Sequence, residues 1–152
     1  MIKLSEMLLF SDNFVRAYEK MCQPLCREFQ IPQTAFDILM FLSNNPQYHT
    51  ASDIVQLRKI KPNLVSFHVE KLAREGLLER RALPGDRRKV MLYCTPRAEP
   101  ITARGREIQQ SFFRAITADI SEEDLHICMN TINRIGGNAE KINREDKGAV
   151  KK

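Results

Sequence analysis

Apolar residues recur every three or four positions through most of the chain, which is the period of amphipathic helices. A first stripe predicts a helix that begins near Leu4, and Pro24 should kink this helix or end it early. A second stripe begins at Pro32, a residue suited to the first turn of a helix, and ends at the Ser-Asn-Asn-Pro run of residues 43–46. The first third of the chain is therefore expected to be helical.

Two shorter helices with a tight turn between them follow. Thr50 and Asp53 have the spacing of a capping box, which predicts a helix start. Lys61-Pro62-Asn63 forms the turn, and the next helix extends from Pro62 to Gly76, with its apolar residues on one face. Two helices joined in this way are a helix-turn-helix signal.

A β-hairpin is predicted directly after these helices. Residues Leu77–Leu83 and Lys89–Cys94 read as two short strands, and Pro84-Gly85-Asp86 between them has the chemistry of a turn. The order helix, turn, helix and basic hairpin describes a winged helix-turn-helix domain.

Two further helices are expected after the hairpin. One opens at Thr95-Pro96, with Thr95 as its cap, and the other opens at Ser121 and carries a heptad-like apolar seam. The fold class is thus mostly α with a small β-hairpin wing (α+β). We expect a single domain over residues 1–152, in which a winged helix-turn-helix lobe (32–95) is flanked by dimerisation helices (1–30 and 96–142) and a frayed tail (143–152).

The positive charge is concentrated in the middle of the chain. Between Thr50 and Met91, ten Lys and Arg residues stand against five Asp and Glu, a surplus that equals the net charge of +5 of the whole chain. Such a basic segment is the electrostatic footprint of a polyanion partner, although a solvated surface has a similar composition.

Other classes of protein receive little support. No apolar run is long enough to cross a membrane and the N-terminus lacks the pattern of a signal peptide, so we expect a cytoplasmic protein without membrane contact. The four cysteines are expected to be free thiols, and no His or Cys spacing predicts a metal site. Because no phosphate-binding loop or catalytic motif is present, we expect neither an enzyme nor a cofactor.

Several local motifs together resemble the MarR family of bacterial transcription regulators. These motifs are Val65-x3-Val69-x2-Leu72-x3-Gly76-Leu77-x2-Arg80, Asp86-x-Arg88 in the wing, Cys94-Thr95, and the Ser-Glu-Glu-Asp-Leu opening of the last helix. The match covers residues 50–98 closely and extends as an order of elements over 4–142. The resemblance implies a homodimer that binds double-stranded DNA at a near-palindromic operator, and repression rather than activation.

The resemblance also implies how DNA would be contacted. The recognition helix (62–75) would lie in the major groove and the wing (83–90) in the minor groove, where Arg88 is the matching arginine and Asp86 orients the wing. Phe67 departs from the family, in which this position is often polar or basic, and its ring could touch a thymine methyl group. The expected DNA-binding residues are Thr50, Lys61, Asn63, Ser66, Phe67, Lys71, Arg74, Arg87, Arg88 and Lys89.

Regulation is left open by the sequence. Family members often bind a small organic effector between the dimerisation helices and the DNA-binding lobe, and others sense oxidants through a cysteine of the first helix. Cys22 and Cys26 share a helix face and are the candidates for a thiol switch, whereas inert packing is the simpler interpretation of a buried thiol. A winged helix that only binds proteins is a further alternative, which the basic wing disfavours.

Overall fold

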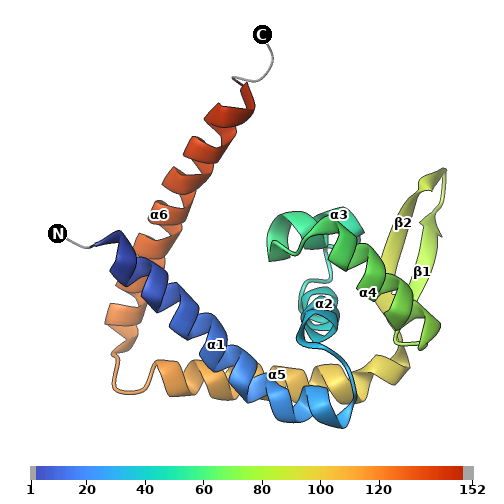
Figure 1. Cartoon of the computed structure of the whole chain (residues 1–152), viewed down its shortest axis with the longest axis horizontal. Coiled ribbons are helices and arrows are strands. Elements are labelled where there is room, and N and C mark those ends of the chain that lie inside the picture. The colour runs from blue at the N-terminus through green and yellow to red at the C-terminus, as the bar shows by residue number, and fades with distance from the viewer. Residues whose placement is uncertain (1–2, 149–152) are drawn as a thin grey trace. The chain divides into compact units, whose positions relative to one another are not determined.

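The computed structural model describes the backbone of residues 3–148 and the side chains of residues 3–144. Met1, Ile2 and residues 149–152 lie outside this range. The chain divides into two compact units, Met1–Phe112 and Phe113–Lys152, and each is described by itself. The first unit contains the winged helix-turn-helix lobe (Figure 1).

The N-terminal helix α1 spans Leu4–Glu28. Pro24 lies inside it, and the helix continues for a further turn. Of the two outcomes expected from this proline, a kink or an early end, the early end is wrong. Only Cys22 and Leu25 of this helix are buried, and both belong to the main hydrophobic core. The first half of α1 exposes large apolar side chains.

Helix α2 (Gln33–Asn44) is the centre of the core. Its Phe36, Ile38 and Leu39 side chains are completely buried, and α1, α4 and β2 all pack against this helix. Because α2 is apolar almost all round, it is the element around which the rest of the lobe assembles.

The helix-turn-helix follows as the sequence predicts, with one irregularity. A short helix α3 (Ala51–Asp53) continues as one turn of π-helix, η1 (Ile54–Arg58), before helix α4 (Pro62–Arg74). Lys59 ends η1 in the left-handed conformation, at φ 60°. Val65, Val69 and Leu72 form the buried face of α4, as expected from their spacing.

The wing is a two-stranded antiparallel sheet. Strand β1 spans Leu78–Leu83 and β2 spans Asp86–Cys94, with Leu78 opposite Cys94 and Arg80 opposite Leu92. The second strand therefore begins three residues before the expected Lys89. Gly85 has φ 90°, a value that glycine adopts without strain, and this allows a tight turn after Pro84.

The link out of the wing differs from the prediction. Thr95 makes no side-chain cap; its hydroxyl donates instead to the carbonyl of Gly76 at 2.6 Å and so ties the end of β2 to the end of α4. A short 3₁₀ helix η2 (Pro96–Ala98) leads into helix α5 (Glu99–Ile116). Gly105 of α5 is buried where this helix approaches Met40 and Phe36 of α2.

Helix α6 (Glu122–Gly148) makes up most of the second unit. The hydroxyl of Ser121 accepts a 3.1 Å hydrogen bond from the backbone N–H of Asp124, so the predicted start of this helix is confirmed. The helix extends to Gly148, into the segment for which we expected a frayed end. Its apolar side chains Ile127, Ile132, Ile135 and Ile142 are exposed within the single chain.

Candidate nucleic-acid interface

Helix α4 presents a continuous exposed side opposite its buried face. Asn63, Ser66 and Phe67 all lie on this exposed side, where the sequence analysis places the base-contacting residues. Lys61 is the residue before the first turn and is exposed as well. The structure thus brings the candidate recognition residues together on one accessible helix face.

The two cations at the end of α4 are held in weak ion pairs on the same helix. Lys71 lies 3.9 Å from Glu75, and Arg74 lies 3.3 Å from Glu70. Pairs of this i, i+4 kind on an exposed surface contribute at most about 0.5 kcal/mol, so a stronger anionic partner can replace the carboxylates at small cost.

Thr50 and Asp53 cap the start of α3 reciprocally. The Thr50 hydroxyl accepts from the backbone N–H of Asp53 at 3.1 Å, and the Asp53 carboxylate accepts from the N–H of Thr50 at 2.9 Å and of His49 at 3.1 Å. Partial burial raises the pKa of Asp53, but these hydrogen bonds and the positive charge of Lys89 in the wing lower it by more. The pKa of Asp53 is therefore below its ordinary value. The predicted capping box is confirmed, and it occupies the Thr50 hydroxyl.

The wing carries its basic residues at an exposed tip. Arg87, Arg88 and Lys89 are all exposed, and within the described part of the chain no carboxylate pairs with either arginine. Asp86 accepts a 3.0 Å hydrogen bond from the backbone N–H of Arg88, which fixes the backbone at the tip. The arginine side chains thus extend from a defined turn with their charges uncompensated.

A stack of rings and a guanidinium joins the wing to the start of α3, and the sequence analysis did not identify it. The centres of the His49 and Tyr93 rings lie 4.5 Å apart. The Arg81 guanidinium lies over the Tyr93 ring, 4.5 Å from its centre. The N–H of Leu92 also donates to the His49 carbonyl at 2.7 Å. No sequence signal marks this contact, since the two segments are more than forty residues apart.

The two cysteines of α1 are in an environment that disfavours thiolates. Cys22 is fully buried and Cys26 is partly buried. Burial raises the pKa of the Cys22 thiol, and burial together with the negative charge of Asp37 raises the pKa of Cys26 to about 11. Since the thiolate is the reactive form, this geometry favours packing over redox chemistry.

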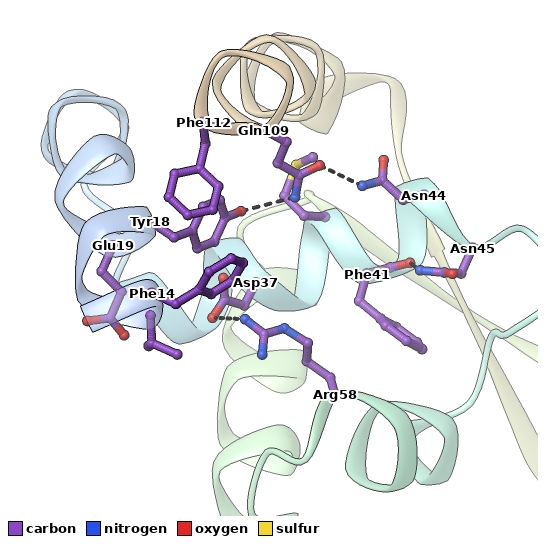
Figure 2. Close-up of a pocket in the computed structure, with 12 residues that line it drawn as sticks. Phe14, Tyr18, Glu19, Asp37, Phe41, Asn44, Asn45, Arg58, Gln109 and Phe112 are labelled. Atoms are coloured by element: carbon purple, nitrogen blue, oxygen red, sulfur yellow. Dashed lines mark hydrogen bonds and ion pairs between the residues drawn. The ribbon is translucent and has the colours of Figure 1, made fainter. Parts of the chain in front are cut away.

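A cavity of about 400 Å³ lies between α1, α2, η1 and α5, within the first unit (Figure 2). Its walls carry four aromatic rings, those of Phe14, Tyr18, Phe41 and Phe112. The polar groups are held by neighbours: the Gln109 amide nitrogen donates to the Tyr18 hydroxyl at 3.0 Å, and its oxygen accepts from Asn44 at 2.8 Å. The cavity has the size and mixed lining of a small-molecule site.

One ion pair lines this cavity and connects α2 with the helix-turn-helix. Arg58, in η1, lies 2.9 Å from the carboxylate of Asp37, which also accepts from Gln33 at 3.0 Å. Burial raises the pKa of Asp37 above its ordinary value, and the nearby Arg58 offsets part of that effect. An occupant of the cavity would therefore lie against a residue of η1, the segment that precedes α4.

The histidine of helix α4 lies on the buried side of this helix. His68 is buried on α4 beside Val69, and burial lowers the pKa of its imidazole. Among the residues that the structure describes, no group of three His, Cys, Asp or Glu side chains is placed to hold a metal ion. No described helix is long and apolar enough to cross a bilayer.

The fold and the exposed helix-and-wing surface define a winged helix-turn-helix protein. The model of the MarR family matches residues 29–89, which span α2 to the tip of the wing. No curated protein matches this chain. The resemblance seen in the sequence motifs is thus confirmed over residues 29–89.

Solved structures of the same fold cover nearly the whole chain. A MarR protein from Peptoclostridium difficile superposes with a TM-score of 0.77 at 16% identity, covering 93% of either chain. A MarR-family regulator from Silicibacter pomeroyi gives 0.76 at 14% identity, over 90% of this chain and 96% of the other. MepR from S. aureus, solved in complex with DNA, gives 0.74 at 17% identity, over 90% of this chain and 96% of its own. The predicted fold of MarR-family transcription regulators is thereby confirmed.

Proposed function

We propose that this protein is a sequence-specific, double-stranded DNA-binding transcription regulator that acts as a homodimer on a near-palindromic operator. Helix α4 would lie in the major groove and the wing in the minor groove. The observation that carries the proposal is the pairing, on one lobe, of an exposed α4 face with a wing tip whose arginines are unpaired in the described structure.

Different side chains of this segment would contact the bases and the phosphates of the DNA. Asn63 and Ser66, near the start of α4, would hydrogen-bond to base edges, while Lys61, Lys71 and Arg74 would reach phosphates. The weak pairs of Lys71 and Arg74 support this division, because a phosphate can take the place of Glu75 or Glu70.

Arg88 is proposed as the minor-groove residue. A narrow, A·T-rich minor groove concentrates negative potential and attracts an inserted guanidinium. The Asp86 hydrogen bond supports this role, since it orders the tip without neutralising the arginine side chain. Arg87 and Lys89 would add charge next to the backbone phosphates.

The dimer is supported by apolar surface that the chain leaves exposed. Leu4, Leu8 and Phe10 of α1 are each more than half exposed, and α6 exposes a row of isoleucines. Large exposed apolar patches are unusual on monomers and mark interaction surfaces. A second copy would cover them, and twofold symmetry would place two recognition helices on two half-sites.

A small organic effector is the proposed release signal, and the cavity supports it. The aromatic walls suit a flat or apolar ligand, and the Asp37–Arg58 pair links the cavity to η1, which precedes α4. Repression through promoter occlusion is the expected mode of action, since the family mostly works in this way. The buried, weakly acidic thiols make redox sensing through Cys22 the less favoured alternative.

Selection of bound sites from a randomised duplex pool, under reducing conditions, tests the proposal. We expect an enriched inverted repeat whose affinity falls steeply with salt, because phosphate contacts release counterions. A pool without enrichment, from protein freed of small molecules by unfolding and refolding, would overturn the proposal. It would leave the alternative of a winged helix that binds only proteins.

A further inference from the structure

The reading side of α4 is unusually apolar for a surface that is to face DNA. Phe67 exposes 62% of its area and Leu64, one turn earlier on the same helix, exposes 39%. The Phe67 ring meets the His68 ring edge to face, with centres 5.1 Å apart and planes at 81°. Phe67 thus takes no part in the hydrophobic core, and its exposed ring is unexplained by folding.

The same part of the helix has no positive side chain. Residues 62–70 contain no Lys or Arg, and the cations of α4 are confined to Lys71 and Arg74 at its C-terminal end. Arg and Lys are the usual readers of guanine, whereas Asn is the usual reader of adenine. Asn63 is placed four residues before Phe67, so the two side chains lie on one helix face.

Duplex DNA offers few apolar partners to such a surface. The major groove is lined by hydrogen-bonding groups, and its apolar feature is the methyl group at C5 of thymine, which 5-methylcytosine shares. Phosphates, which Lys61 and the wing would contact, gain nothing from a phenyl ring. An exposed Phe and Leu at the reading face are therefore complementary to methyl groups on the floor of the groove.

We propose that Phe67, with Leu64 beside it, reads the C5 methyl groups of thymines in the half-site, and that Asn63 reads the adenine paired with the contacted thymine. This inference rests on the proposed DNA-binding function and specifies its sequence preference: a half-site core of A·T pairs. Thymine is favoured over 5-methylcytosine because adenine, the partner of thymine, is the base that an asparagine pairs with in two hydrogen bonds.

Uracil substitution tests the proposal, because it removes the methyl group and leaves every hydrogen bond of the base pair unchanged. In the selected operator, each thymine of the half-site is replaced by deoxyuridine, one at a time and symmetrically in both halves. At the contacted position we expect affinity to fall about fourfold per methyl group, the equivalent of about 0.8 kcal/mol. A Phe67→Ala variant should bind the thymine and uracil operators equally.

Two controls separate methyl reading from general weakening. Arg74→Ala removes an exposed charge from the same helix, so it should weaken binding to both operators and leave the ratio of their affinities unchanged. Deoxyuridine placed outside the half-sites should have no effect. Because Phe67 is exposed, its alanine variant is expected to fold, which circular dichroism and the unfolding midpoint will verify.

The outcomes are distinct. Uracil operators bound as tightly as thymine operators, or an equal uracil effect in Phe67→Ala, would overturn methyl reading and leave the DNA-binding function intact. Replacing the critical T·A pair by 5-methylcytosine·G should restore less affinity than thymine gives. Full restoration would show that the methyl alone is read and would contradict the role of Asn63. Absence of any selected operator would count against the proposed function itself.

Discussion

The carboxylate of Asp86 accepts a 3.0 Å hydrogen bond from the backbone N–H of Arg88 at the start of strand β2. The bond fixes the backbone on which the Arg88 side chain is mounted, and it uses the main chain rather than the guanidinium. The charge of Arg88 therefore stays available while its backbone is held in place. This arrangement lowers the entropy cost of inserting the side chain into a groove.

We predict that Arg88→Ala weakens binding to the selected operator tenfold or more, about 1.4 kcal/mol. The matched control is Arg87→Ala, which removes the same charge from the neighbouring residue and should cost a smaller factor. Fluorescence anisotropy with operator and scrambled duplexes measures both. Equal affinity of Arg88→Ala and the unaltered protein for the operator would contradict a minor-groove role.

We predict that Arg58→Ala lowers the free energy of unfolding in a pH-dependent way. The pKa of Asp37 is already raised by burial, and loss of Arg58 will raise it further. A carboxyl group whose folded pKa is raised stabilises the protein less as pH rises through that pKa. At pH 7 the variant should therefore lose about 1–2 kcal/mol, an estimate between those for exposed and buried pairs.

The pH dependence distinguishes this effect from a general loss of packing. At an acidic pH below the raised pKa, the Asp37 carboxyl is protonated with or without its partner, so the difference in unfolding free energy should shrink. Arg16→Ala is the control, since the Arg16–Asp12 pair is exposed and its loss should change stability by less than about 0.5 kcal/mol. Urea unfolding at the two pH values measures both variants. A deficit that is the same at both would refute the role of Asp37 ionisation.

We predict that the protein sediments as a dimer of about 35 kDa, twice the 17.6 kDa of the chain. Ile132→Glu, on the apolar seam of α6, should shift the equilibrium toward monomer because it would place a charge in the interface. Leu57→Glu is the control, since Leu57 is equally exposed but lies on η1. A stable monomer of the unaltered protein in sedimentation equilibrium would refute dimerisation.

Hydrophobic periodicity and capping residues were sufficient to predict the elements of the lobe. Val65, Val69 and Leu72 gave the buried face of α4, and Thr50 with Asp53 gave the start of α3. Local sequence signals predict an element less well where a residue from a distant segment offers an alternative hydrogen-bond partner. The Thr95 hydroxyl donates to the carbonyl of Gly76 and does not cap the next helix. The sequence around either residue does not indicate this hydrogen bond.

The candidate site was predictable in part for the same reason. Exposed polar residues on α4 and the basic wing follow from the sequence pattern, because each belongs to one local element. The Asp37–Arg58 pair and the stack of His49 on Tyr93 join residues that are far apart in the chain, so only the tertiary structure reveals them. Pro24 does not end α1 early, because packing of Cys22 and Leu25 in the core outweighs the one backbone hydrogen bond that proline removes.

The last prediction concerns Gly105, at the closest approach of α5 to α2. A methyl group added there would overlap the Met40 sulfur and press on the Phe36 ring, both of which are buried. We expect Gly105→Ala to lower the free energy of unfolding by about 1–2 kcal/mol, because overpacking outweighs the gain in helix propensity. Gly137→Ala is the matched control: it lies in α6 with no atom of the described chain within 4 Å of the added methyl, so it should raise stability by up to about 1 kcal/mol. Thermal unfolding of the two variants under identical conditions compares them directly, and a stabilised Gly105→Ala would show that α5 and α2 can separate without cost.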